Sequence, residues 1–381
     1  AHAQVAPIKR TSVIPPATAI FAHNGMVVAQ ESRAARIGVE ILDRGGNAVD
    51  AAVAVGFAMA VTYPRAGNLG GGGFMVIHLA KGLDTTIDYR ETAPAAATPT
   101  MFLDDKGNPD PTKSRDSGLA VGVPGTVAGL ALAHKKYGSG KLTLADLIAP
   151  ALHLAQQGFP VEDDIAASLP RAKDRLARWP ASASLFLNGG EPLHEGDRLL
   201  QFDLADTLRA IAQDGPRAFY EGHIAEEIAA AVRGAGGIMT TDDLKNYHAA
   251  ERAPVRGSYR GYDIVAMPPP SSGGVALIEM LNILEGYDLG KLPREQALHD
   301  MIEAMKRAYA DRAIYMGDPD QVKMPIAGLL SKKYATTLRA SITDKATAAA
   351  AIKAGKPADT EGKNTTHFSV IDRDGNAVSN T

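Results

Sequence analysis

The order of hydrophobic and polar positions along this chain predicts alternating helices and strands. In residues 32–45 the apolar positions Ile37 and Ile41 recur at helical spacing, with Ser32 available as the cap and Gly45 as the stop. Four further amphipathic stretches predict helices, and the first three end in glycine, as helices commonly do: 143–158, 204–215, 223–237 and 295–318. The middle of the chain is therefore expected to be mostly helical.

A second helix is expected directly after the first one. Asn47 is placed to cap it, Asp50 stands at its third position, where a negative charge suits the amide-rich end of a helix, and Pro64 closes it. The run 51–64 is the most apolar in the chain, yet it is too short to cross a bilayer. We therefore interpret it as a buried helix.

Strand-like runs flank the helical middle. Residues 74–80 and 85–90 lie on either side of a turn at 81–84, and 259–267 run into the rigid loop 268–274. Because helices are predicted on either side of these strands and no internal repeat is present, the pattern indicates a layered α/β architecture.

The last part of the chain changes character twice. Residues 341–364 are polar and rich in Ala, Lys and Gly, which is the profile of a mobile segment. Strand character returns at 367–371, a turn is expected at Asp374–Gly375, and residues 376–381 begin another strand. A polar segment thus leads directly into a strand close to the end of the chain.

Composition narrows the class of protein. The chain has 381 residues, of which 45% are hydrophobic and 22% charged, as in a soluble globular protein with a large core. Its net charge of −3 gives no overall attraction to nucleic acid or to an anionic membrane, so neither is expected as a partner. The absence of cysteine excludes disulfides, thiolate chemistry and cysteine-ligated zinc.

The first residues favour export. Ala1-His2-Ala3 resembles the small-residue motif that precedes signal cleavage, and a chain without cysteine fits a periplasmic or secreted protein. A remnant of cloning is the alternative origin of these residues. We therefore expect a periplasmic location.

Three sequence features carry weak functional signals. The glycine run 67–73 lacks the Gly-Lys-Ser/Thr ending of a P-loop and follows a helix, so we expect it to let backbone pack closely against a substrate or a neighbouring strand. The ten histidines show no metal-ligand spacing, and no metal is expected. Ser271 and Ser272 lie in the stiff loop outside any G-x-S-x-G motif, which favours a structural turn over substrate contact.

Arg90 is a candidate for substrate binding. It closes the strand-like run 85–90, in which Thr86, Asp88 and Arg90 share one face. One interpretation is an ordinary ion pair with Asp88 or Glu91. The other is a guanidinium fork that grips a substrate carboxylate through two hydrogen bonds. The residue pattern by itself favours the ion pair and leaves both interpretations open.

Thr365 is the candidate with the most distinctive chemistry. A threonine hydroxyl is a weak nucleophile unless a base adjoins it. Cleavage between Asn364 and Thr365 would give Thr365 a free α-amine with a pKa of roughly 7.7–8.0, which can accept the proton of its own hydroxyl at neutral pH. The preceding segment would leave the bond accessible, and the following strand would hold the new terminus. The plain alternative is that Thr365 and Thr366 merely begin a β-branched strand.

Several long motifs together resemble the γ-glutamyltranspeptidase family, in its bacterial periplasmic branch. They occur in the family's order from about Ala29 to Thr381: GNLGGGGFM, DYRETAP, GVPGTVAG, ERAPVRGSYRGYDIVAMPPPSSGG, YADRAIYMGDPD and NTTHFSVIDRDGNAVS. The resemblance implies a four-layer αββα sandwich of the N-terminal nucleophile hydrolases, an α+β fold. It also implies a single precursor that cleaves itself into a large and a small subunit.

The resemblance assigns roles to individual residues. The family's cleavage site precedes the first threonine of its TTH motif, which is Thr365 here, and its carboxylate-binding arginine falls on Arg90. Residues 1–364 would then belong to the large subunit and 365–381 would begin the small subunit, the two forming one interleaved domain. The expected activity is transfer or hydrolysis of the γ-glutamyl group of glutathione or glutamine. Water, an amino acid or a peptide would accept that group, without a metal or organic cofactor.

The family's small subunit continues well beyond the GNAVS motif. That continuation supplies a second threonine, the groups that hold the substrate's α-amine and the glycines of the oxyanion hole, so this chain is expected to need a further segment for turnover. Two rival functions stay open. One is a cephalosporin or glutaryl acylase of the same family, and the other is a periplasmic protein that binds γ-glutamyl peptides without chemistry.

Overall fold

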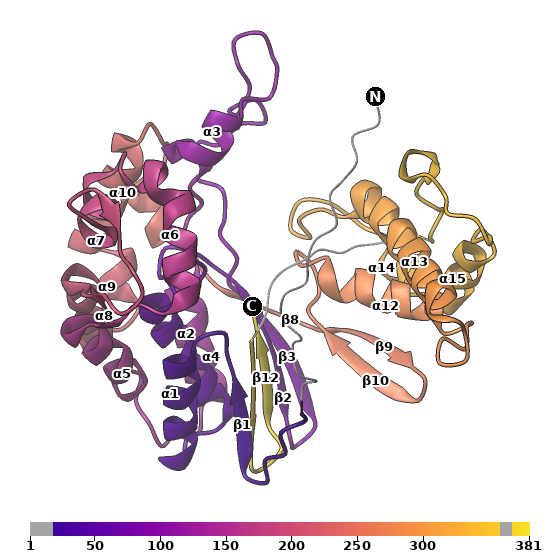
Figure 1. The fold of residues 1–381 in the computed structure, drawn as a ribbon, viewed down its shortest axis with the longest axis horizontal. Coiled ribbons are helices and arrows are strands. Elements are labelled where there is room, and N and C mark those ends of the chain that lie inside the picture. The colour runs from indigo at the N-terminus through magenta and orange to yellow at the C-terminus, as the bar shows by residue number, and fades with distance from the viewer. Residues whose placement is uncertain (1–17, 359–367) are drawn as a thin grey trace.

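The fold has two lobes: a large lobe that contains a central sheet, and a small lobe that lies beside the upper end of that sheet (Figure 1). The structure is a computed structural model that describes residues 18–358 and 368–381. The large lobe comprises residues 18–252 and 368–381, and the small lobe comprises residues 253–358. Each lobe has a hydrophobic core of its own.

The large lobe is built on an antiparallel sheet in the order β1-β11-β12-β2-β3-β8. Its strands are β1 (Gly25–Val28), β2 (Phe74–Leu79), β3 (Leu83–Asp88), β8 (Ala250–Arg252), β11 (Phe368–Asp372) and β12 (Ala377–Asn380). The two strands that come last in the sequence lie in the interior of the sheet, as Figure 1 shows in yellow. The sequence predicted both of these strands, and the turn between them is confirmed by Gly375, whose φ is 86°.

Helices cover one face of this sheet. The nearest are α1 (Ser32–Asp43) and α2 (Ala48–Thr62), and α2 contacts β11 and β12 directly. α4 (Thr126–Tyr137) lies beside α2 and also contacts β3, and behind α2 lie α5 (Leu144–Gln157) and then α8 (Phe202–Asp214). Almost every residue of α2 is buried, because sheet and helices surround it, which confirms the buried helix expected there.

The caps of the first two helices show where the sequence prediction held and where it was wrong. Asn47 caps α2 as expected: its side chain accepts hydrogen bonds from the amides of the first turn, and Asp50 bonds back to the amide of Asn47. Ser32 is not the cap of α1. Glu31 takes that role, because its Oε2 accepts the amide of Ala34 at 2.9 Å and Ser32 is already helical.

The outer helices complete the large lobe. They are α3 (Pro111–Asp116), α6 (Asp163–Leu176), α7 (Pro180–Phe186), α9 (Arg217–Tyr220), α10 (His223–Gly234) and α11 (Thr241–Lys245), with the short strands β4 (Phe159–Pro160), β5 (Leu187–Asn188), β6 (Glu191–Pro192) and β7 (Arg198–Leu199). The helices predicted in the middle of the chain are confirmed, and Gly158 and Gly215 end two of them with φ of 68° and 73°.

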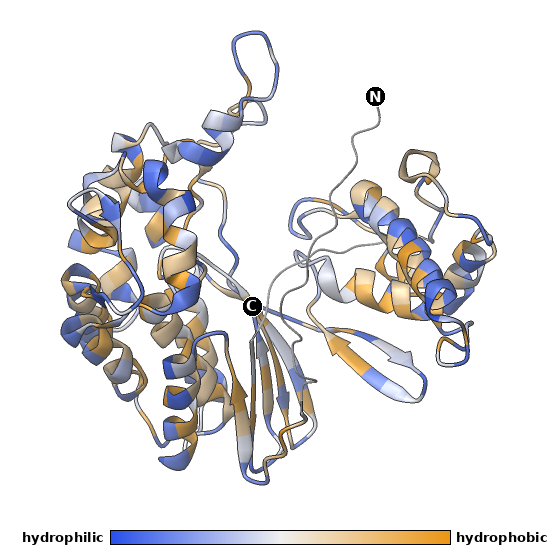
Figure 2. Ribbon diagram, viewed as in Figure 1, coloured by the Kyte–Doolittle hydropathy of each residue, from blue (hydrophilic) through white to orange (hydrophobic). Residues whose placement is uncertain are grey.

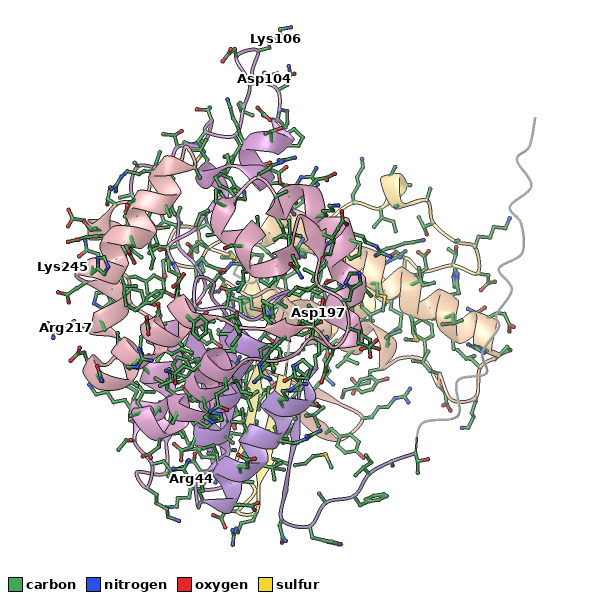
Figure 3. The ribbon with its side chains drawn as sticks, turned by 60° about the vertical axis from the view of Figure 1, so that its left-hand side comes forward. Arg44, Asp104, Lys106, Asp197, Arg217 and Lys245 are labelled. Atoms are coloured by element: carbon green, nitrogen blue, oxygen red, sulfur yellow. The ribbon has the colours of Figure 1, made fainter. Side chains whose placement is uncertain are left out.

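Charged side chains cover the outer surface of this helical layer. Arg217 and Lys245 project outward from α9 and α11, and Asp104 and Lys106 lie at the tip of a loop that extends from the lobe (Figure 3). That tip is ordered locally, because Oδ1 of Asp104 accepts the amides of Lys106 and Asn108, both at 2.8 Å. None of the described helices is both long and apolar enough to span a membrane.

Over residues 253–358, the small lobe combines a β-hairpin with four α-helices and a short 3-10 helix. Its elements are β9 (Val255–Tyr259), β10 (Tyr262–Ala266), α12 (Gly273–Leu284), α13 (Arg294–Tyr315), α14 (Ile326–Leu329) and α15 (Lys332–Arg339). The strand and the long helix expected here are both present. The hydropathy pattern did not indicate that they form a core separate from that of the large lobe.

The two faces of the central sheet differ in environment. Side chains alternate along each strand, so Met75, Ile77 and Val378 point toward the helices and are buried. The opposite face, which we call the open face, carries Val28 and Ile371, which are 56% and 45% exposed. This alternation is visible as changing hydropathy along the strands (Figure 2). The open face is therefore apolar in part and has no helical layer among the described residues.

Candidate functional site

A cavity of about 300 Å³ opens beside the end of β3. Its walls come from the loop 66–73, from Arg90 and Glu91, from the facing sides of α2 and α4, and from the chain end Asn380–Thr381. Segments distant in sequence meet here because β12 lies next to β2 in the sheet. The cavity combines an apolar floor with a small number of charged and amide groups, which is typical of a small-molecule site.

The glycine run forms one wall by packing directly on the strand ends. The amide of Gly73 donates to the carbonyl of Tyr89 at 3.2 Å, and the amide of Tyr89 returns a bond to Gly73 at 3.0 Å. A Cβ on Gly73 would lie 2.1 Å from the carbonyl oxygen of Thr381, so no other residue fits without movement. The expectation that these glycines allow close backbone packing against a neighbouring strand is confirmed.

The first turn of α4 closes the cavity from behind. The amides of Gly125 and Thr126 donate to the carbonyl of Gly71 at 2.7 and 3.0 Å, which fixes the glycine loop to the helix. A Cβ on Gly129 would lie 2.1 Å from Cγ of Tyr89, so the tyrosine ring packs flat on the helix backbone. The loop, the helix and the end of β3 therefore form one tightly packed frame.

Tyr89 links this frame to the last strand of the sheet. It is buried, and its hydroxyl donates to Oδ1 of Asn380 at 2.6 Å. Burial raises the pKa of Tyr89 well above its ordinary value, so the phenol stays neutral and remains a donor. Neither residue was singled out from the sequence, because the contact joins positions far apart in the chain.

Arg90 follows at the rim of the cavity, two residues beyond the end of β3, so it lies after the strand rather than within it. Both of its backbone groups are held: its amide donates to Oδ1 of Asp88 at 3.1 Å, and its carbonyl accepts the hydroxyl of Tyr247 at 2.8 Å. Its guanidinium carbon lies 5.9 Å from the centroid of the Phe74 ring. The side chain is exposed at the cavity mouth.

The charge of Asp88 is paired with a residue that the sequence interpretation did not include. Oδ2 of Asp88 accepts Nε of Arg252, on β8, at 2.8 Å. Burial raises the pKa of Asp88, and the hydrogen bonds from Arg252 and from the amide of Arg90 oppose that shift. Asp88 therefore orients the backbone of Arg90, while its carboxylate charge faces Arg252.

The second candidate residue, Thr365, lies outside the described residues, as do Asn364 and Thr366. The strand next to them in the chain is well defined. Phe368 is the first residue of β11 and lies opposite Asn380 of β12. At the far end of β11, Oδ2 of Asp372 accepts the amide of Ala48 at 3.0 Å, which ties the strand to the first turn of α2. The strand after Thr365 is thus fixed at both ends.

The weaker candidates have structural roles. Ser271 and Ser272 are buried; Oγ of Ser272 accepts Nε of Arg312 at 2.8 Å, and Oγ of Ser271 accepts the amide of Gly273 at 3.3 Å. This agrees with the structural turn favoured from the sequence. Within residues 18–358 and 368–381, no group of three or more His, Asp or Glu side chains is arranged to hold a metal ion.

Comparison with known proteins gives consistent matches. The profile of the γ-glutamyltranspeptidase family matches residues 34–381. The chain is 50% identical over 366 residues to the glutathione hydrolase proenzyme of Escherichia coli (strain K12), covering 95% of this chain and 63% of that protein. It is 42% identical over 367 residues to the acylase ACY 1 proenzyme of Pseudomonas sp. (strain V22), covering 94% and 64%.

A solved structure matches as well. The crystal structure of Helicobacter pylori γ-glutamyltranspeptidase is similar with a TM-score of 0.86 at 45% identity, covering 89% of this chain and 97% of that chain. The α+β sandwich fold expected from the sequence is therefore confirmed. The chain spans about 63% of the length of the Escherichia coli relative, so it represents less than two thirds of such a protein.

Proposed function

Because this chain belongs to the γ-glutamyltranspeptidase family, we propose that the whole protein transfers and hydrolyses γ-glutamyl groups after cleaving its own backbone between Asn364 and Thr365. Glutathione and glutamine are the proposed donors, and water, an amino acid or a peptide accepts the group. The fragment that begins at Thr365 is the start of the small subunit, and residues 1–364 are the large-subunit part. The proposed setting is the periplasm, which the lack of cysteine supports.

One geometric observation carries this proposal. Phe368 lies opposite Asn380, and Asn380 lines the same cavity as Arg90. Three residues of chain span at most about 10 Å, so Thr365 is no farther than that from Phe368 along the chain. We propose that a nucleophile on Thr365 and a carboxylate-binding group on Arg90 act on one small substrate in this cavity.

The proposed maturation produces both the nucleophile and its base by one backbone cleavage, which takes place in two steps. The hydroxyl oxygen of Thr365 attacks the carbonyl carbon of Asn364, the C–N bond breaks, and the proton passes to the released amine. The resulting ester is hydrolysed by water, which leaves a carboxylate on Asn364 and a free amine on Thr365. That amine has a pKa of roughly 7.7–8.0, so its neutral form is available as a base near neutral pH.

In the mature enzyme the same hydroxyl attacks the γ-carbonyl of the donor. The α-amine of Thr365 takes the hydroxyl proton and delivers it to the leaving amine, and a γ-glutamyl ester forms on Thr365. Water or an acceptor amine then attacks the ester and regenerates the hydroxyl. Arg90 holds the α-carboxylate of the donor, a charged bidentate contact whose loss costs about 2–4 kcal/mol of binding.

The acylase similarity supports a second candidate function. A glutaryl group keeps the terminal carboxylate of a γ-glutamyl group and lacks only its α-amine, so Arg90 could bind either acyl group and the groups that hold the α-amine distinguish the two. The identity of 50% to a glutathione hydrolase proenzyme, against 42% to the acylase proenzyme, favours the γ-glutamyl assignment. A binding protein without chemistry would use Arg90 equally well but would gain nothing from a free threonine terminus.

The test is a paired assay on the purified full-length protein. We expect release of p-nitroaniline from γ-glutamyl-p-nitroanilide and no deacylation of glutaryl-cephalosporin at the same enzyme concentration. The Thr365→Ala variant should release nothing. Preference for the glutaryl substrate would favour the acylase, and binding without turnover of either substrate would favour the binding protein.

A further inference from the structure

Arg252 lies where the two lobes meet and bonds to both of them. It is the last residue of β8, immediately before the chain enters the small lobe, and its side chain is 19% exposed. On the large-lobe side its Nε donates to Asp88 at 2.8 Å. On the small-lobe side its two terminal nitrogens form a fork on Asp320, with distances of 3.1 and 2.7 Å.

The backbone of Arg252 is fixed as well as its side chain. Thr86 of β3 lies opposite Arg252 in the sheet, and its hydroxyl donates to the carbonyl of Arg252 at 2.8 Å. The guanidinium is therefore presented to Asp88 from a defined position. Asp320 is held in its own loop, because its amide donates to Oδ1 of Asp318 at 2.9 Å.

A continuous series of bonds leads from Asp320 to the proposed donor-binding residue. Asp320 holds Arg252, Arg252 holds one oxygen of Asp88, and the other oxygen of Asp88 accepts the amide of Arg90. We propose that Arg252 is a positioning residue. By binding Asp88 and the small lobe together, it fixes the backbone of Arg90 and thereby the direction in which the Arg90 guanidinium points. The inference rests on the proposed function for the role of Arg90 and for the identity of the donor.

Loss of Arg252 would change the site in a specific way. Asp88 is buried, and besides Arg252 the ionisable groups coupled to it are Asp320 and Tyr247, neither of which supplies positive charge. The pKa of Asp88 is already raised by burial, and Arg252 opposes that shift. Without Arg252 the carboxyl would take a proton at higher pH or move toward water, and in either case its bond to the amide of Arg90 would weaken.

The test uses an ion pair of the same kind as a matched control. Arg256, on β9, also joins the lobes by pairing with an aspartate, Asp84, at 2.7 Å, but Asp84 lies near the far end of β3 from Arg90. Arg252→Met and Arg256→Met therefore remove the same charge from the same junction. Only the first is predicted to disturb Arg90.

We expect Arg252→Met to raise the KM for γ-glutamyl-p-nitroanilide roughly tenfold, the equivalent of about 1.4 kcal/mol, with kcat changed much less. Arg252→Lys should recover part of the loss, because an ammonium restores charge but cannot bond Asp88 and fork on Asp320 together. In Arg252→Met the rise of KM toward acid should begin at higher pH than in the wild type. Arg256→Met should match the wild type in KM, in kcat and in the pH dependence of KM.

A KM for Arg252→Met equal to that of Arg256→Met would overturn the inference. If Arg252→Met fails to fold, the Asp320→Asn variant tests the inference in its place. Asp320 is mostly exposed, and the substitution removes only the ion pair between Arg252 and the small lobe. A raised KM in that variant supports the inference, and an unchanged KM overturns it. Failure of the wild type to mature or to turn over the substrate would instead refute the proposed function.

Discussion

The buried hydroxyl of Tyr89 donates a hydrogen bond of 2.6 Å to Oδ1 of Asn380. Tyr89 directly precedes Arg90, and Asn380 lies opposite Phe368, the first described residue after Thr365. One bond thus joins the segment that carries the proposed substrate-binding arginine to the strand pair that carries the proposed nucleophile. The described chain segments next to the two proposed site residues are therefore linked to each other.

Tyr89→Phe should both destabilise the protein and disturb the proposed substrate site. The substitution leaves Oδ1 of Asn380 buried without this donor, which costs about 1–3 kcal/mol. Denaturant unfolding measures the loss, and kcat/KM should fall in the same variant. Tyr262→Phe is the control, because Tyr262 is 77% exposed. Equal free energies of unfolding for the two variants would contradict this assignment.

Arg90→Lys should impair donor binding while self-cleavage proceeds. An ammonium cannot provide the planar pair of donors that a carboxylate accepts, so the KM for the γ-glutamyl donor should rise sharply. The contacts that fix this segment are made by the backbone of residue 90, and they survive the substitution. Steady-state kinetics on the matured variant checks the prediction. An unchanged KM would remove Arg90 from the substrate site.

Stability should depend on pH through a buried carboxyl group in the small lobe. Glu279 lies on α12, and burial together with the neighbouring charge of Asp311 raises its pKa to about 10. In the unfolded chain the pKa is about 4.3, so between these values the unfolded state loses a proton that the folded state keeps. The stability contributed by this group therefore falls as pH rises from about 4.3 toward 10.

Glu279→Gln isolates this effect. Glutamine has nearly the same shape and does not titrate, so the free energy of unfolding of the variant should fall less steeply than that of the wild type between pH 6 and pH 9. The difference in slope is bounded by about 1.4 kcal/mol per pH unit. Denaturant unfolding at several pH values measures it. Parallel pH profiles for the two proteins would show that Glu279 is not protonated in the folded state.

The parts of the fold that depend on local pattern were predictable. The helix cap at Asn47 and the glycine stops at Gly158 and Gly215 depend on neighbouring residues, and so does the strand pair around Gly375. Glu31 was missed as a cap because a glutamate reaching the third amide resembles an ordinary surface charge in the sequence.

The parts of the site that depend on long-range pairing were not predictable. One interpretation of the sequence paired Arg90 with Asp88 or Glu91, but β8 pairs with β3 and brings Nε of Arg252 within 2.8 Å of Asp88. Tyr89 and Asn380 meet only because the last strands insert into the sheet beside β2. Such contacts join residues more than 150 positions apart, and hydropathy patterns carry no information on which strands will pair.

The intact mass of the purified full-length protein tests the central claim most directly. The account predicts two polypeptides, the smaller of which begins at Thr365, and a single uncut chain for Thr365→Ala. A wild-type protein that remains one unbroken polypeptide while it still consumes glutathione would contradict it.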